Sequence, residues 1–272
     1  MNAESRLAAQ GISLRYGERT VVADLDLEVP DGQFTVVVGP NACGKSTLLR
    51  ALARILKPSA GQVVLDSHDI HSRPAKQVAR SLGMLPQSAT APEAITVADL
   101  VGRGRFPHQT LLRQWSDADQ QAVDDAMRAA GVTDLARRAV DELSGGQRQR
   151  AWLAMVLAQQ TRLLLLDEPT TFLDISHQLD VLDLCADLRT DGYTIVAVLH
   201  DLNQACRYAD HLVVMSEGRI VAAGPPEDVI NPDLVGEIFG LECSVIPDPA
   251  TGTPLVVPAA RSGRIRPSAP TH

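Results

Sequence analysis

Aromatic residues are scarce in this chain of 272 residues, since Phe, Trp and Tyr make up 3% of it. So few rings cannot form a platform on which successive bases of a single-stranded nucleic acid would stack. Long hydrophobic runs are also missing: stretches such as residues 151–158 and 193–199 fall well short of the roughly 18 apolar residues of a membrane span. The sequence therefore predicts neither a single-stranded nucleic-acid binder nor a transmembrane protein.

Paired cysteines and an excess of basic residues are absent as well. Cys43, Cys185, Cys206 and Cys243 are widely spaced, with no C-x-x-C pair, which is typical of reduced thiols in a cytosolic protein. A formal net charge of -8 argues against nucleic acid as a partner and against a polybasic membrane footprint. The N-terminus lacks the basic and apolar regions of an export signal, so we expect a cytoplasmic location.

The remaining composition, with 45% hydrophobic and 21% charged residues, is that of a globular protein. Residues 9–38 alternate short apolar and polar segments, which predicts a small, mostly antiparallel sheet. The strand 34–38, a glycine turn and a helical pattern over 45–56 then begin an α/β core. Apolar strands at 163–166 and 194–199, with a helical pattern between them, indicate that the core sheet is parallel.

Between about residues 88 and 160 the strand signals give way to helical ones, which predicts an α-helical subdomain inserted into the core. Ser116 with Asp119 resembles a capping box that opens a helix ending at Gly131, and Thr133 is a candidate cap for another.

Short strands are predicted again at 211–215 and 219–222, followed by a helical segment at 232–239. The stretch 259–272 has three arginines, two prolines and almost no large apolar residue, so we expect a disordered tail. The folded domain is accordingly predicted to span 1–258.

The strongest motif matches G-x-x-x-x-G-K-[ST] and lies between a predicted strand and a predicted helix. Its glycines let backbone N–H groups surround phosphate oxygens, Lys45 adds a cation at the β- and γ-phosphates, and Ser46 offers a hydroxyl to Mg²⁺. The implied ligand is ATP or GTP, and the motif alone does not distinguish a kinase, a GTPase and a motor. The predicted nucleotide-binding residues are Gly39, Pro40, Asn41, Ala42, Cys43, Gly44, Lys45, Ser46 and Thr47.

Two consecutive carboxylates, Asp167 and Glu168, follow the apolar strand at 163–166. At this edge of the sheet Asp167 can hold the Mg²⁺ shell, while Glu168 can reach the γ-phosphate and act on the attacking water. Solvated acids can also simply terminate a strand, but a phosphate loop upstream favours the functional interpretation. The pair predicts hydrolysis.

A second anion site is predicted at the start of the helical stretch 148–160. Ser144 is a good N-cap there, and the two glycines after it let a phosphate approach the helix N-terminus. On its own the pentapeptide could equally be an ordinary capped helix. Its residues are Leu143, Ser144, Gly145, Gly146 and Gln147.

Taken together, the motifs resemble the nucleotide-binding subunit of an ABC transporter, over roughly residues 10–240. In chain order they are the phosphate loop, Gln87, LSGGQ at 143–147, LLLLDEP at 163–169, Leu173-Asp174 and His200. The resemblance implies a P-loop, RecA-like α/β fold and hydrolysis of ATP with Mg²⁺. It also implies a homodimer of ATPase subunits, two integral-membrane permease subunits and, indirectly, an extracytoplasmic substrate-binding protein. The chain would then be a peripheral protein at the cytoplasmic face of the cell membrane.

The resemblance also assigns roles to single residues. Tyr16 would stack on adenine, Gln87 would contact Mg²⁺ and the lytic water, Asp174 would lie at the dimer seam, and His200 would reach the γ-phosphate beside Glu168. The alternatives are that Tyr16 is a surface tyrosine of a hairpin, that Gln87 is a polar loop residue and that His200 is a histidine at the end of a strand.

Ala42 and Cys43 are the two phosphate-loop residues whose identity is unusual or chemically reactive. Ala42 stands where the family often has glycine, and its methyl group is expected to leave binding intact if its φ is negative. Cys43 lies near a helix N-terminus, which favours the thiolate form of its side chain, so it is a candidate reactive cysteine. The alternative is that it is a small side chain that only fills space.

Four stretches resemble one branch of the family, the ATPases of importers for ferric siderophores, haem and cobalamin: 102–108, 171–178, 246–249 and 252–254. Within that branch a ferric siderophore is the favoured cargo, with haem or cobalamin as alternatives. The part at 105–108 is expected either to contact the membrane subunits or to form an exposed loop.

Two other classes are disfavoured. A soluble ABC ATPase of DNA repair, translation or cluster assembly usually has two motif sets, a coiled coil or a zinc hook, and this chain has one set and neither insertion. A module that switches without hydrolysis is opposed by the presence of both Glu168 and His200.

Overall fold

A six-stranded sheet forms the centre of the computed structural model, which describes residues 5–87, 90–109 and 115–259. Its strand order is β10-β9-β3-β8-β7-β6, and every neighbouring pair is parallel except β9 with β10. All residues of β3, β7 and β8 are buried, as expected for strands covered on both faces. The strands are β3 (Phe34–Val38), β6 (Leu82–Leu85), β7 (Leu163–Asp167), β8 (Thr194–Val198), β9 (His211–Ser216) and β10 (Arg219–Gly224).

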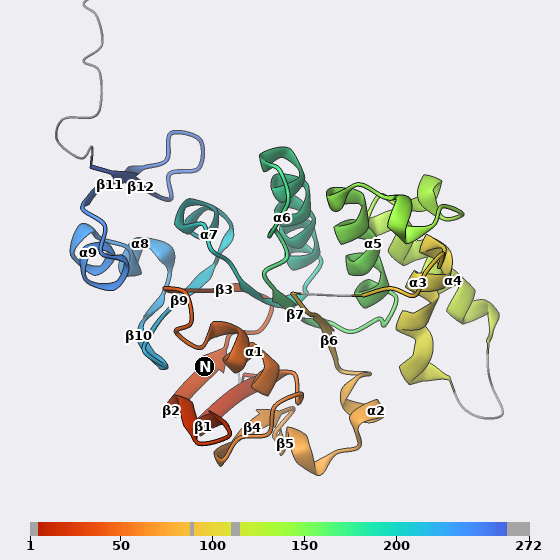
Figure 1. Ribbon diagram of the computed structural model, residues 1–272, viewed down its shortest axis with the longest axis horizontal. Helices are drawn as coiled ribbons and strands as arrows, with labels where there is room; N and C mark the ends of the chain where they lie inside the picture. Colours follow the sequence, from red (N-terminus) through yellow and green to blue (C-terminus); the bar gives the residue numbers. More distant parts are fainter. Residues whose placement is uncertain (1–4, 88–89, 110–114, 260–272) are drawn as a thin grey trace, which may run out of the picture.

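A second, antiparallel sheet lies below the first in Figure 1, with α1 (Lys45–Leu52) between the two. Leu48 and Leu49 of α1 are fully buried in a core that contains residues of both sheets. Of the segments within 9–38, the first two strands form this antiparallel sheet, whereas β3 joins the parallel sheet, as predicted for the strand that begins the α/β core. The antiparallel strands, in spatial order, are β2 (Arg19–Val29), β1 (Leu7–Tyr16), β4 (Ala60–Leu65) and β5 (His68–Asp69).

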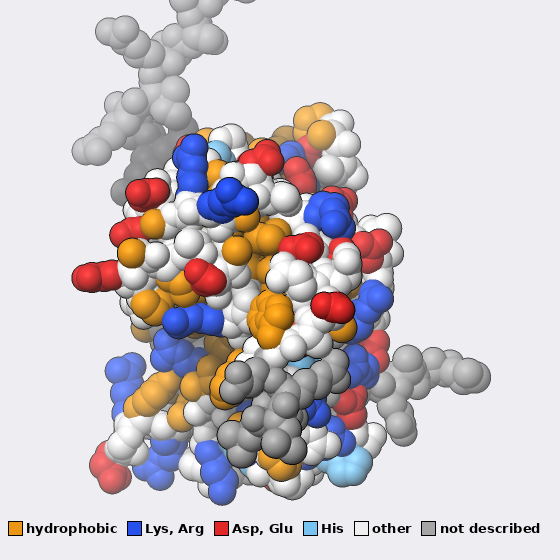
Figure 2. Space-filling model, turned by 90° about the vertical axis from the view of Figure 1, so that its right-hand side faces the viewer, with side chains coloured by type: hydrophobic (Ala, Val, Ile, Leu, Met, Phe, Trp, Pro, Cys, Tyr) orange, Lys and Arg blue, Asp and Glu red, His pale blue; other side chains and the backbone are white. Residues whose placement is uncertain are grey.

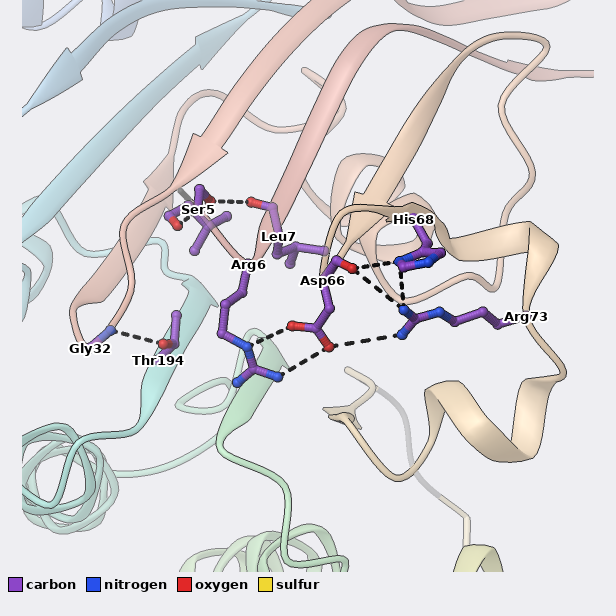
Figure 3. Close-up of polar contacts among 9 residues, drawn as sticks. Ser5, Arg6, Leu7, Gly32, Asp66, His68, Arg73 and Thr194 are labelled. Atoms are coloured by element: carbon purple, nitrogen blue, oxygen red, sulfur yellow. Dashed lines mark hydrogen bonds and ion pairs between the residues drawn. The ribbon is translucent and has the colours of Figure 1, made fainter. Parts of the chain in front are cut away.

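Asp66 links the start of β1 to the turn between β4 and β5 (Figure 3). Asp66 and Ser67 both have positive φ, of 48° and 62°, as a two-residue hairpin turn of type I′ requires. The Asp66 carboxylate accepts hydrogen bonds from Nε and Nη2 of Arg6 at 2.8 and 3.3 Å and forms an ion pair with Arg73 at 3.9 Å. These contacts fix the edge of the antiparallel sheet.

The helices of residues 97–157 gather at one end of the molecule (Figure 1). The capping box of Ser116 and Asp119 is present as predicted, whereas the expected cap at Thr133 was wrong, because no side chain of the described residues caps the short helix there. The elements are α3 (Val97–Gly102), η2 (Arg103–His108), α4 (Asp117–Ala129), η3 (Thr133–Leu135), η4 (Val140–Glu142) and α5 (Gly145–Leu157).

Arg105 of η2 is an internal connector and not the surface residue expected of an exposed loop. Its side chain is 4% exposed, and it donates hydrogen bonds to Asp119 at 2.9 Å and to the carbonyl of Ala158 at 2.7 Å. It therefore joins the N-terminus of α4 to the C-terminus of α5. The neighbouring Phe106, which is 69% exposed, is the residue of this stretch that reaches the surface.

Helix α1 ends at Leu52 and not at Leu56, because Arg54 adopts a left-handed conformation with φ 65°. No helix within the described ranges is long and apolar enough to cross a membrane. The predicted tail lies, after residue 259, outside the described residues. The remaining elements are η1 (Ile70–Ser72), α2 (Ala75–Val78), α6 (Ile175–Thr190), α7 (Leu202–Tyr208), α8 (Pro226–Val229), α9 (Pro232–Phe239), β11 (Cys243–Pro247) and β12 (Pro254–Pro258).

Candidate functional site

The phosphate loop connects β3 to α1 and leaves the first turn of the helix open. Gly44 precedes the helix with φ 110°, and among the described residues no side chain bonds to the helix N-terminus there. Gly39 is required because a Cβ atom would lie 2.1 Å from the carbonyl oxygen of Met215. The ammonium of Lys45, a residue only 5% exposed, donates to the carbonyls of Gly39 at 2.8 Å and Pro40 at 2.9 Å. The loop thus presents backbone N–H groups and a cation, which suits phosphate.

Ala42 does not meet the condition expected of it. Its φ is +62°, a left-handed conformation that costs an L-residue about 1–2 kcal/mol. Cys43 is 6% exposed and belongs to the same hydrophobic core as Leu48 and Leu49 of α1, which agrees with the interpretation that it fills space.

Glu168 is the centre of the predicted catalytic residues. Its Oε1 lies 2.7 Å from Nε2 of His200, and its Oε2 accepts hydrogen bonds from Nε2 of Gln87 at 2.6 Å and from the hydroxyl of Thr171 at 3.0 Å. The ends of β6, β7 and β8 supply Gln87, Glu168 and His200, because these three strands are adjacent and parallel. The structure therefore brings together three residues that are distant in sequence.

Asp167 is the last residue of β7 and is 1% exposed. Neither of its carboxylate oxygens has a hydrogen-bond partner among the described residues. Burial raises the pKa of Asp167 above its ordinary value, while the nearby Ser46 hydroxyl offsets part of the rise and the charge of Glu168 adds to it. A buried carboxylate without partners beside a hydroxyl fits a divalent cation, which prefers oxygen ligands.

A cavity of about 250 Å³ joins the loop to these catalytic candidates. A carboxylate beside an imidazole at the mouth of a phosphate-binding loop can accept a proton from a water molecule that attacks the terminal phosphate. The cavity is lined by Arg19, Val21, Asn41, Ala42, Gly44, Lys45, Ser46, Thr47, Glu168 and His200.

Arg19 and Thr171 were missed by the sequence analysis. Arg19 lies opposite Tyr16 across the two-residue turn of the β1–β2 hairpin, and that spacing could have paired them. Tyr16 is 46% exposed and, within the described chain, does not line the cavity, so its stacking on adenine stays a prediction. Thr171 begins the stretch 171–178 noted in the sequence, but its contact with Glu168 was not predicted, because it depends on the turn after β7.

The predicted second anion site begins α5 with a capping box. The hydroxyl of Ser144 accepts from the backbone N–H of Gln147 at 3.3 Å, and the side-chain oxygen of Gln147 accepts from the N–H of Ser144 at 3.2 Å. Residues 143–147 all lie in the described part of the chain, and none of them lines the cavity. Instead, Gly145 and Gly146 pack beside the segment 172–177.

Asp174, in that segment, is the N-cap of α6. Its Oδ1 accepts hydrogen bonds at 3.0 Å from the backbone N–H of His177 and from the hydroxyl of Ser176, and these bonds lower the pKa of Asp174. This capping role needs no second chain, and the position at a dimer seam stays a prediction.

Comparison with known proteins connects this geometry to one family. Residues 22–171 match the family model described as ABC transporter. The chain is 56% identical, over 95% of its length and 96% of the relative, to the ferric enterobactin transport ATP-binding protein of Escherichia coli strain K12. It is 50% identical, over 97% of each chain, to the petrobactin import ATP-binding protein FpuD of Bacillus anthracis. A solved ABC transporter assigned to the metal-chelate type, in an inward-facing conformation, has a TM-score of 0.82 at 28% identity and covers 95% of this chain and 98% of its own.

Proposed function

The chain belongs to the ABC transporter family, and from this premise we propose that it is the ATP-hydrolysing subunit of an importer for a ferric siderophore. The cargo is inferred from the relatives that serve ferric enterobactin and petrobactin transport and that match almost the whole chain. The hydrolytic activity is inferred from the site, where Glu168 is held between His200 and Gln87 at the edge of the phosphate-loop cavity.

In the proposed reaction Glu168 accepts a proton from the attacking water, while His200 and Gln87 orient its carboxylate. Lys45 stabilises the charge that develops on the phosphate oxygens. Ser46, Asp167 and Gln87 would hold Mg²⁺, which when bound neutralises charge on the β- and γ-phosphates.

We infer that a second copy of the chain completes the site. Residues 143–147 begin α5 with a capping box and, in the described chain, lie outside the phosphate-loop cavity of their own subunit. In a face-to-face dimer the partner's residues 143–147 would cover the γ-phosphate held by residues 39–47, and Asp174 would lie at the seam. Closure around ATP and reopening after hydrolysis would then drive the attached subunits.

The attached subunits are proposed to be two membrane permeases, with the chain bound peripherally at the cytoplasmic face of the membrane and a substrate-binding protein outside. Figure 2 shows the end of the molecule that carries the helices of residues 97–157, where hydrophobic side chains lie among charged ones. A hollow there is lined by the exposed side chains of Phe106 and Trp115, with Arg103 beside them. Asp99 also lines the hollow, and this mixture of apolar and charged groups suits a docked protein segment.

The activity is tested by phosphate release from Mg-ATP. Glu168→Gln keeps the shape of the side chain but removes its basicity, so turnover should fall about 10²- to 10⁴-fold while ATP binding is retained. Glu237→Gln, which changes an exposed acid on α9, is the matched control and should release phosphate at the unmodified rate. Near-normal phosphate release by Glu168→Gln would remove Glu168 from the mechanism.

A further inference from the structure

The C-terminal hairpin of β11 and β12 has no part in the function proposed above. It carries the stretches 246–249 and 252–254 that were notable in the sequence, and the two strands pair from Cys243 with Pro258 to Pro247 with Pro254. The hairpin packs on α7, which begins two residues after His200. The hairpin is therefore close in space to the helix that follows His200.

Two side chains of α7, one helical turn apart, attach it to the hairpin. The amide of Asn203 accepts from the backbone N–H of Val256 at 2.7 Å and donates to its carbonyl at 3.2 Å, so that it pairs with β12 as a neighbouring strand would. Arg207 donates from Nε and Nη2 to Oδ2 of Asp248 at 3.1 and 2.6 Å. Because Asn203 and Arg207 are four residues apart, they share one face of the helix.

The turn of the hairpin holds Asp248 ready for this contact. Asp248 is 5% exposed, and its Oδ1 accepts from the backbone N–H of Ala250 at 2.8 Å. Its own N–H donates to the carbonyl of Thr253, and its carbonyl accepts from Gly252, whose φ of 77° favours glycine. Val256, which is 4% exposed, packs into the main hydrophobic core. These bonds explain the Asp and the Gly of the turn, and Val256 anchors the hairpin to the core.

On its other side α7 is attached to α6. Gln204 donates to the side-chain oxygen of Gln178 at 2.7 Å, and the hydroxyl of Tyr208 donates to Asp183 at 2.6 Å. Helix α7 has only seven residues, which is too few for a helix to be stable without tertiary contacts. Its position is therefore set by tertiary contacts: Ala205 and Cys206 are fully buried in the main hydrophobic core, and the side chains named above connect the helix to α6 and to the hairpin.

We propose that the C-terminal hairpin positions His200 against Glu168 by fixing α7, with Asn203, Arg207 and Asp248 as positioning residues for ATP hydrolysis. This inference rests on the proposed function, since it takes His200 and Glu168 as the hydrolytic pair. Helix α7 and helix α1 pack in different hydrophobic cores, since Ala205 belongs to one core and Leu48 to the other. Of the residues that line the phosphate-loop cavity, His200 is the one next to α7, so the hairpin should change the rate of hydrolysis more than the binding of ATP.

The first test is Asp248→Asn in the full chain. The variant removes the charge that pairs with Arg207 but can still accept from Ala250. We expect kcat to fall about five- to tenfold because a displaced catalytic group loses rate steeply, whereas KM for Mg-ATP stays unchanged. Hydrogen exchange of the peptide covering 199–209 should become faster. Arg6→Ala is the matched control, because it breaks an Arg–Asp pair of similar geometry in the antiparallel sheet and should leave both readouts unchanged.

The second test repeats Asp248→Asn in a His200→Ala background, with Asn203→Ala as a second variant. If the hairpin acts through His200, neither substitution lowers kcat further in that background. The same fold loss with and without His200, or an unchanged kcat despite faster exchange at 199–209, would overturn the proposal. If His200→Ala itself hydrolyses ATP at the full rate, the proposed role of His200 fails first, and the exchange measurement still reports whether the hairpin holds α7.

Discussion

At the scale of single residues, two non-glycine positions of the site have left-handed backbones. Ala42 has φ +62° and Glu168 has φ +54°. Such conformations cost energy and persist where the surrounding structure determines them, which is common at functional sites. For Glu168 the conformation turns the side chain toward His200 and Gln87 directly after β7. For Ala42 no contact in the structure explains why glycine is replaced.

Replacing Ala42 with glycine should therefore stabilise the chain. Relief of the left-handed strain outweighs the extra freedom of glycine in the unfolded state, so we expect the free energy of unfolding to rise by about 0.5–1 kcal/mol. Urea denaturation without nucleotide measures it. Ala186→Gly, inside α6, is the control, and it should lower the free energy of unfolding by about 1 kcal/mol. Destabilisation by Ala42→Gly would show that the methyl group makes a favourable contact.

Asp167 gives a prediction about pH. Since burial raises its pKa in the folded chain, the folded state binds more protons than the unfolded state at pH values just above about 4. The ionised carboxylate thus destabilises the fold at neutral pH, and this penalty disappears as the pH falls through the raised pKa. Asp167→Asn should therefore raise the free energy of unfolding of the nucleotide-free chain, and the gain over the unmodified chain should be larger at pH 7 than at pH 5. The same substitution should reduce the stabilisation by Mg-ATP.

Asp174→Asn is the control of opposite sign. Hydrogen bonds lower the pKa of Asp174, so its contribution to stability is present above the ordinary carboxyl pKa and is lost as the pH falls. Urea midpoints at the two pH values compare the variants. If Asp167→Asn lowers the free energy of unfolding by the same amount at both pH values, the ionised Asp167 does not destabilise the folded chain.

The residues that local motifs identify were predictable, and those that depend on tertiary contacts were not. Lys45, Ser46, Asp167 and Glu168 stand at motif spacings between a strand and a helix, so their positions follow from the chain alone. The hydroxyl of Thr171 reaches Glu168 only through the turn after β7.

At the scale of elements, periodicity predicted the buried strands of the parallel sheet and the helix α4 with its capping box. It missed β4, β6 and the C-terminal hairpin. The sequence A-G-Q-V-V-L of β4 starts with three exposed residues, and β6 has only four residues, so neither alternates long enough to be distinguished from a loop. The hairpin strands begin or end with proline, which usually interrupts a strand.

The start of α5 packs tightly enough to give a prediction for Gly146. A Cβ atom there would lie 2.5 Å from the ring of His177, which belongs to the first turn of α6. Gly146→Ala should therefore force the two helices apart and lower the free energy of unfolding by about 1–3 kcal/mol.

Gly236→Ala in α9 is the matched control for Gly146→Ala. A Cβ atom at Gly236 would meet no atom of the described chain within 4 Å, so alanine should stabilise the helix by about 0.5–1 kcal/mol. Thermal unfolding of the two variants measures both effects. Equal stabilisation by the two substitutions would mean that α5 and α6 separate easily.

At the scale of the whole molecule, the two motifs that we propose to bind ATP lie at different places in the chain. The phosphate loop, Asp167, Glu168 and His200 surround one cavity, while residues 143–147 begin α5 elsewhere in the described chain. In the proposed mechanism the chain therefore acts only when two copies and their membrane partners assemble. Hydrolysis at Glu168 is accordingly proposed to power the import of a ferric siderophore.

The role in import is tested by uptake of ⁵⁵Fe from a ferric siderophore in cells from which the gene for this chain has been deleted. We expect uptake to be lost in the deletion strain, restored by the unmodified chain and by Glu237→Gln, and absent with Glu168→Gln at equal protein levels. Uptake of haem and cobalamin should be unaffected. Normal ⁵⁵Fe uptake in the deletion strain with no second chain of this kind, or full restoration by Glu168→Gln, would contradict the account.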